Sequence, residues 1–206
     1  MGEPTWNPNV LDATMWLKKH IDPEYKIHPV VSTMMPRNND WLKTFIHTWM
    51  RIKNRKLDGN AGLQLSINST SEEERQLMFN GNACSFYQIA KIMHGIVPHG
   101  RKITLNFAIA DYTIDAKRLR EYFDPDDYIV KLTPMHKTET ALSHNIKTQG
   151  DYTTMYPYKT HEENLKEQGF DVLVFIASKE EDDGLITCGN AILSGSLPKT
   201  EYRKIK

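Results

Sequence analysis

The sequence predicts an α/β fold in which parallel strands are joined by helices. Short apolar segments alternate with segments whose apolar residues recur at helical spacing, and this alternation continues along most of the chain. Such alternation is typical of parallel strands joined by right-handed crossover connections. The composition, 39% hydrophobic and 25% charged over 206 residues, is that of one globular domain or part of a larger one.

Five apolar segments are expected to be the strands of this fold. They comprise residues 27–35, 62–68, 103–110, 128–135 and 172–177. Most of them are followed by polar or turn-forming residues, which mark the ends of strands in a chain of this kind.

Six helices are expected between and around these strands. They begin near residues 9, 40, 72, 86, 115 and 161, and they end near residues 22, 56, 78, 96, 123 and 169. Pro23 ends the first, and Ser85 with Gln88 forms a capping box for the fourth. The basic residues Arg51, Lys53, Arg55 and Lys56 are interpreted as the solvated end of the second helix, with an RNA contact as the alternative.

One long segment, residues 137–160, has no convincing periodicity and is expected to be a functional or mobile loop. The net charge is zero, which gives no support for nucleic-acid binding through overall positive charge but leaves a local basic patch possible. No apolar run is long enough for a membrane span, and no signal peptide is visible. The only cysteines, Cys84 and Cys188, do not form a disulfide framework, and a cytoplasmic protein is expected.

Polar side chains follow most of the expected strands. Because the carboxyl ends of parallel strands share one edge, where α/β proteins bind ligands, these residues are candidates for a site. They are Glu3, Ser32, Ser66, Asn68, Asp111, His136 and Cys188. Each also has an ordinary interpretation, as a turn or cap residue or, for Cys188, as a small buried hydrophobic residue. No Walker loop, Gly-x-Ser-x-Gly, HExxH or paired CxxC occurs, so no metal site made by this chain is expected.

Several short motifs occur in an order that suggests a family. They are Met1-Gly2-Glu3-Pro4, Val31-Ser32-Thr33, Leu65-Ser66-Ile67-Asn68, Leu132-Thr133-Pro134-Met135-His136 and Thr187-Cys188-Gly189-Asn190. Together they resemble the radical S-adenosylmethionine methyltransferases that modify an adenine of 23S ribosomal RNA. The resemblance extends over residues 1–195 and leaves a polar, basic tail, 196–206.

The resemblance implies a partial parallel (β/α) barrel of the radical-SAM type and a set of cofactor contacts. Gly2 and Glu3 match the family's Gly-Glu-Pro motif, which binds the amino end of S-adenosylmethionine. Further cofactor contacts are implied for Ser32, Ser66, Ile67, Asn68 and His136. Cys188 matches the cysteine that accepts a methyl group and carries it to RNA, a role that requires its thiolate.

The chain departs from the family's pattern in several places. Asn68 stands where the family has histidine, His136 where it has asparagine, and Asn190 where it has glutamine. The CxxxCxxC loop that holds the family's [4Fe–4S] cluster is missing, and it belongs on a strand upstream of Met1. The chain is therefore expected to be the C-terminal portion of a radical-SAM core, lacking one or more N-terminal strands, with no metal ligands of its own and no activity when alone.

Three functions remain open. The first is an RNA (adenine) methyltransferase acting through a methylated Cys188, completed by the missing N-terminal portion or a partner subunit. The second is a radical-SAM reaction on another substrate, which the zero net charge and the changes at Asn68 and His136 favour. The third is a non-catalytic fragment that binds S-adenosylmethionine or a partner protein.

Overall fold

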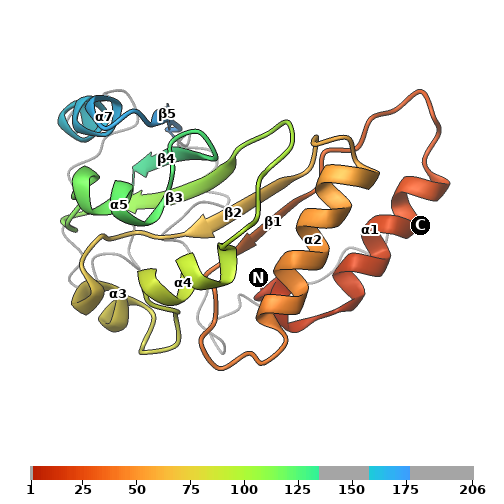
Figure 1. The fold of residues 1–206 in the computed structure, drawn as a ribbon, viewed down its shortest axis with the longest axis horizontal. Coiled ribbons are helices and arrows are strands. Elements are labelled where there is room, and N and C mark those ends of the chain that lie inside the picture. The colour runs from red at the N-terminus through yellow and green to blue at the C-terminus, as the bar shows by residue number, and fades with distance from the viewer. Residues whose placement is uncertain (1, 135–157, 177–206) are drawn as a thin grey trace, which may run out of the picture.

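The computed structural model describes residues 2–134 and 158–176, which form five parallel strands with helices between them (Figure 1). The strands are β1 (Val30–Thr33), β2 (Gly62–Ser66), β3 (Ile103–Ile109), β4 (Tyr128–Pro134) and β5 (Asp171–Val174). They lie side by side in the order in which they occur in the chain, and each neighbouring pair is parallel. This confirms the predicted α/β fold with a parallel sheet.

The strand order is informative because a doubly wound sheet reverses its order at a switch point, whereas a (β/α) barrel does not. Here the order β1-β2-β3-β4-β5 has no reversal. With right-handed crossovers, such an order places every connecting helix on the same face of the sheet. The described part is therefore compatible with part of a barrel wall.

The helices are short except for α1 and α2. Their bounds are η1 (Pro4–Trp6), α1 (Asn9–His20), α2 (Leu42–Lys56), α3 (Glu72–Met78), α4 (Phe86–Met93), α5 (Ala116–Tyr122) and α7 (Tyr158–Glu167). Along the sheet, α2 contacts α4, α4 contacts α5, and α5 contacts α7. The helices that connect the strands thus form one continuous layer. Within the described residues, none of the helices is long and apolar enough to cross a membrane.

The hydrophobic core lies between this helix layer and one face of the sheet. Alternate strand residues point into it, and the fully buried ones include Leu63, Leu65, Leu105, Phe107, Val130 and Leu132. Phe45, Ile46 and Trp49 of α2 pack against them, and the Trp49 indole N–H donates to the Gly62 carbonyl at 3.0 Å. The apolar side chains of α2, which recur at helical spacing, therefore belong to the core.

The other face of the sheet is called the open face here, and it carries the intervening strand residues. They are Val30, Ser32, Gly62, Gln64, Ser66, Thr104, Asn106, Ile129, Lys131, Thr133, Asp171, Leu173 and Phe175. Side chains alternate between the two faces of a strand, so this set follows from the register. Many of its members are polar, and this polarity makes the open face the natural place to look for a site.

Most element predictions are confirmed, with shifts of a few residues at their ends. The largest differences are in β1, which covers four residues of the predicted nine, and in α7, which begins at Tyr158. Tyr158 is 1% exposed, and burial of its ring anchors the first turn of α7.

The interpretation of residues 51–56 as solvated is wrong for Lys53, which is fully buried and donates to the His99 carbonyl at 2.5 Å. The loop at 137–160 falls mostly outside the described residues.

Candidate functional site

Glu3 joins the start of the chain to the carboxyl end of β1. Its Oε2 accepts a hydrogen bond from the backbone N–H of Met34 at 3.0 Å, directly after β1. Its Oε1 accepts from the N–H of Thr5 at 3.1 Å and from the Thr5 hydroxyl at 2.7 Å. A carboxylate has about four acceptor positions, so Glu3, which is only half-buried, retains capacity for a further donor. A ligand ammonium is the kind of group that such a carboxylate can accept.

Gly2 lies beside Glu3 and is exposed. A Cβ added at Gly2 would meet no heavy atom within 4 Å, so the space above this backbone is open. The predicted Gly-Glu pair thus provides one carboxylate, hydrogen-bonded just after β1, and one stretch of accessible backbone beside it.

Ser32 and Ser66 are brought to the same face by the parallel register of β1 and β2. Ser32 is opposite Gln64, whose side-chain amide donates to the Ser32 hydroxyl oxygen at 3.0 Å. Ser66 follows Gln64 by two residues on the same strand and is opposite Asn106 of β3. Hydroxyl and amide groups of two strands thus converge near the carboxyl edge of the open face.

Asn68 has a left-handed backbone, with φ of +62°. Asparagine tolerates this conformation better than most residues. Its Oδ1 accepts from the Ala108 backbone N–H at 2.9 Å, which attaches the end of β2 to β3. No acceptor for its Nδ2 occurs among the described residues, so this amide has a free donor at the edge of the sheet.

Ile67 offers much less to a ligand than its neighbours do. Its side chain is fully buried, and its N–H donates to the Asn106 carbonyl at 2.9 Å. Its own carbonyl accepts from the guanidinium of Arg75. Of the six predicted cofactor residues in the described part, Ile67 is the one placed in the core.

Arg75 was not predicted as important, yet it holds the end of β2 in place. It is fully buried in α3 and donates to the carbonyls of Ser66 and Ile67 and, at 3.0 Å, to that of Cys84. Its guanidinium also lies 5.1 Å from the ring centroid of Phe86. Burial lowers the pKa of Arg75 to about 10, which leaves it charged at neutral pH. A buried arginine with three carbonyl partners fixes the backbone that carries Ser66 and Asn68.

A second link near this edge is made by Glu74 of α3. Its carboxylate accepts from the Ser69 hydroxyl and from both the N–H and the hydroxyl of Thr113 at 2.9 Å. Partial burial opposes ionisation, but the hydrogen bonds from Ser69 and Thr113 prevail and lower the pKa of Glu74. The loop after β3, which includes the exposed Asp111, is thereby tied to the loop after β2.

Two other residues of the open face form a buried polar pair that sequence reasoning missed. The Thr133 hydroxyl donates to Asn106 Oδ1 at 3.2 Å, and both side chains are 5% exposed. Lys131, two residues before Thr133, lies on the same face, with its Nζ 4.8 Å from the ring centroid of Phe175. Asn106, Lys131 and Thr133 are polar residues at every second position within 103–110 and 128–135, and this alternation could have indicated them.

The remaining predicted residues have simple outcomes. His136 and Cys188 lie outside the described residues. Cys84 is buried, and burial is the main reason that the pKa of its thiol is raised, which is typical of a cysteine that serves as core packing. Within residues 2–134 and 158–176, no three histidine, cysteine, aspartate or glutamate side chains are grouped as metal ligands would be.

No family model matches the chain, and no curated protein is significantly similar to it.

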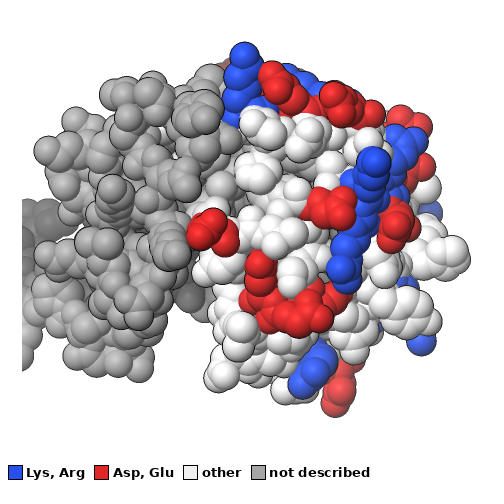
Figure 2. Space-filling view, turned by 90° about the vertical axis from the view of Figure 1, so that its left-hand side faces the viewer, with Lys and Arg blue, Asp and Glu red and all other residues white. Residues whose placement is uncertain are grey.

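Surface charge over α3, α5 and α7 is mixed. On the described part of this face, small groups of Lys and Arg side chains lie next to small groups of Asp and Glu side chains (Figure 2). An RNA-binding surface normally concentrates positive charge. This face therefore gives no electrostatic support for an RNA contact.

Proposed function

We propose that the chain is the S-adenosylmethionine-binding portion of a radical-SAM enzyme, with RNA (adenine) methylation through Cys188 as its reaction. The observation that carries the proposal is the position of Glu3. Its carboxylate lies at the carboxyl end of β1, on the edge where Ser66 and Asn68 also stand. The unreversed strand order supports a barrel-type scaffold for such a site.

The described residues fit an amino-acid cofactor in their chemistry. Glu3 can accept from an ammonium group, and the free amide N–H groups of Asn68 can donate to a carboxylate or a ribose hydroxyl. Ser32 and Ser66 add hydroxyl groups on the open face. S-adenosylmethionine supplies the methyl group when bound, and the chain's residues orient it by these contacts.

The chain does not fit an iron–sulfur cluster of its own. A [4Fe–4S] cluster requires at least three thiolates, and the whole sequence has only Cys84 and Cys188. Cys84 is buried in the core, so it is not available as a ligand of the cluster. The ligands of a cluster would have to come from another polypeptide segment, and the proposal therefore includes such a segment as a partner.

Binding of S-adenosylmethionine and S-adenosylhomocysteine to the purified chain, measured by isothermal titration calorimetry, tests the cofactor site. Glu3→Gln removes the charge and leaves one acceptor oxygen in place of two. It should weaken binding about ten-fold, the value of one charged hydrogen bond. Asn68→Ala should weaken it by a similar factor. Glu163→Gln on the exposed side of α7 is the matched control. Absence of binding, or equal affinity of all variants, would contradict the proposal.

The role of Cys188 requires the complete enzyme. Cys188→Ala together with its complementing segment should not methylate an RNA substrate, and intact-protein mass spectrometry should lose the methylated form. Cys84→Ala is the control, because Cys84 is buried packing. Methylation by Cys188→Ala at the wild-type rate would exclude this mechanism.

A radical-SAM reaction on a substrate other than RNA is the second candidate. It is favoured by the zero net charge and by the mixed signs of the charges on the face shown in Figure 2. An affinity for ribosomal RNA that falls steeply with salt would favour the RNA reaction. No such affinity, combined with intact binding of S-adenosylmethionine, would favour the alternative.

A further inference from the structure

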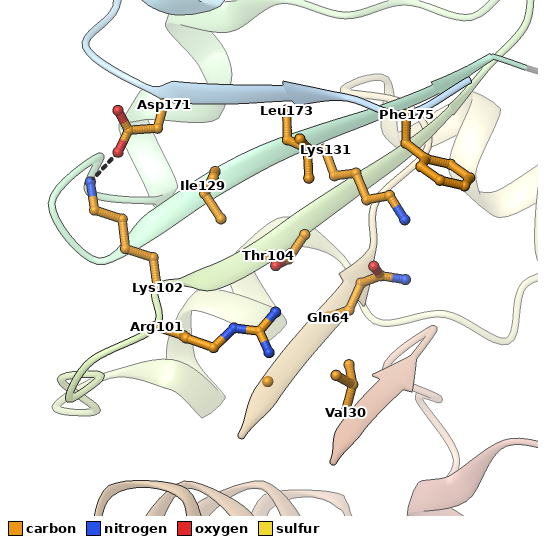
Figure 3. A pocket seen from close by; sticks show the side chains of 11 residues that line it. Val30, Gln64, Arg101, Lys102, Thr104, Ile129, Lys131, Asp171, Leu173 and Phe175 are labelled. Atoms are coloured by element: carbon orange, nitrogen blue, oxygen red, sulfur yellow. Dashed lines mark hydrogen bonds and ion pairs between the residues drawn. The ribbon is translucent and has the colours of Figure 1, made fainter. Parts of the chain in front are cut away.

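The open face of the sheet contains a pocket that the proposed cofactor site does not use. It has a volume of about 640 Å³ and lies over the amino-terminal and middle parts of the strands. Its walls are side chains of all five strands and the two residues before β3, Arg101 and Lys102 (Figure 3). This volume is in the range of pockets that bind small organic molecules.

The pocket carries an excess of positive charge. Among the described residues that line it, three have cationic side chains, and Asp171 alone has a carboxylate. Lys102 is neutralised, because its Nζ lies 2.7 Å from Asp171 and close enough to Asp127 to affect the pKa of that carboxyl. Arg101 and Lys131 have no carboxylate within ion-pair distance among the described residues. Two uncompensated positive charges thus remain on the pocket wall.

Arg101 adds to the positive potential of its surroundings. Burial, and to a smaller extent the charge of Arg101, lower the pKa of Lys53 to about 8. Lys53 and Arg101 therefore lie close enough for the charge of one to affect the other. Within the described part of the chain, the Arg101 side chain makes one hydrogen bond, a long one of 3.4 Å to the Asn60 carbonyl.

Part of the pocket wall is apolar. Val30, Leu173 and Phe175 are 53%, 52% and 42% exposed, which is unusual for large apolar side chains grouped on one face. Figure 3 shows Lys131 and Arg101 extending toward the middle of the pocket, with Gln64 and Thr104 between them. Cations and hydrogen-bonding groups at the centre and apolar walls around them suit a molecule with an anionic group and an apolar body.

We propose that this pocket binds a small organic anion, with its carboxylate or phosphate held by Arg101 and Lys131 and its apolar body against Val30, Leu173 and Phe175. The proposal does not depend on the cofactor site. Glu3, Ser66 and Asn68 are not part of the pocket wall.

Matched aromatic probes test this proposal on the purified chain by calorimetry. The probes are 2-naphthoate, 2-naphthyl phosphate and the neutral 2-naphthylmethanol, which share an apolar body and differ in charge. The anions should bind at least ten-fold more tightly than the alcohol, and their affinity should fall as salt rises. The stronger of the two anions identifies whether carboxylate or phosphate is preferred.

Variants locate the binding. Arg101→Gln and Lys131→Gln should each weaken anion binding about five- to ten-fold, and Lys131→Arg should retain it. Arg55→Gln, on the exposed side of α2, is the control. Circular dichroism should show that each variant is folded. Equal binding of alcohol and anions, identical affinities of the Arg101→Gln and Arg55→Gln variants, or no binding of any probe would each overturn the proposal.

Discussion

Individual buried polar residues decide the geometry of the sheet edge, and they are the features that a sequence conceals best. Lys53 and Arg75 both occur in runs of charged residues that a pattern-based reading assigns to solvent. Both are fully buried. Their partners are backbone carbonyls of distant loops, at His99 for Lys53 and at Cys84 for Arg75. No local pattern could have predicted partners that only the tertiary fold brings near.

Replacing Arg75 is expected to be among the most destabilising single changes. Arg75→Met would leave the carbonyls of Ser66, Ile67 and Cys84 without their donor in a buried site. Each unsatisfied buried group costs on the order of 1–3 kcal/mol, so a loss of about 3 kcal/mol or more in the free energy of unfolding is expected. Urea denaturation measures it, with Arg55→Met as an exposed control. A loss as small as that of the control would mean that the guanidinium does not hold the end of β2.

Lys53 should make stability depend on pH in the alkaline range. Burial and the charge of Arg101 lower its pKa to about 8 in the folded protein, whereas an unfolded lysine has a pKa of about 10.4. Between these values the unfolded chain binds more protons, so the free energy of unfolding should rise with pH from about 8 to about 10.4. The contribution of Lys53 to the free energy of unfolding is therefore present above a pH of about 10.4 and is lost as the pH falls to about 8.

The measurement is the difference between wild type and Lys53→Met in urea denaturation at pH 7.5, 9 and 10. Other lysines and tyrosines titrate in both proteins, so the difference isolates Lys53. The free energy of unfolding of the wild type should rise relative to that of the variant as the pH increases. A difference that stays constant over this range would show that the folded pKa of Lys53 is not depressed.

At the level of elements, the sequence predicts most of what the structure contains. The capping box predicted at Ser85 and Gln88 located the start of α4 well, because a cap is a local signal contained in four consecutive residues. Ser71 accepts from the N–H of Glu74, and Ser85 and Gln88 form the full capping box. The ends of β1 and α7 were less accurate because strand pairing and the burial of Tyr158 set them. Those contacts are not local.

The capping box of α4 makes a defined contribution to stability. Ser85→Ala should lower the free energy of unfolding by about 1 kcal/mol, because it removes the acceptor for the Gln88 N–H. Ser85→Asp should keep most of the stability, since aspartate is an equally good cap. Thermal denaturation of both variants measures the difference. Equal melting temperatures for Ser85→Ala and wild type would show that the loop before α4, rather than its cap, sets where this helix begins.

At the level of the whole molecule, the sequence predicts the fold class and the edge of the sheet that carries the candidate site. It does not reveal the pocket on the open face, because the pocket depends on register. Arg101, Lys131 and Phe175 come from three separate segments and meet only when β3, β4 and β5 pair as they do. A sequence shows which residues alternate along a strand but not which strands lie side by side.

The same sheet should have a gradient of local stability from its centre to its edges. β3 pairs with a strand on each side, and its core-facing residues Leu105 and Phe107 are fully buried. Within the described part, β5 is a terminal strand whose residues are half-buried or exposed. Amides with few buried neighbours exchange through local openings that need less free energy than global unfolding.

Native-state hydrogen exchange should therefore protect the amides of Leu105 and Phe107 most strongly. Those of Leu173 and Val174 in β5 should exchange at least ten-fold faster. Val130→Ala in β4 truncates a core side chain and should lower the free energy of unfolding by about 1–3 kcal/mol. It should also accelerate the hydrogen exchange of the β3 amides, because these amides exchange by global unfolding. The amides of β5 should change much less, because they already exchange through local opening. Equal acceleration in both strands would instead mean that the sheet opens as a single cooperative unit.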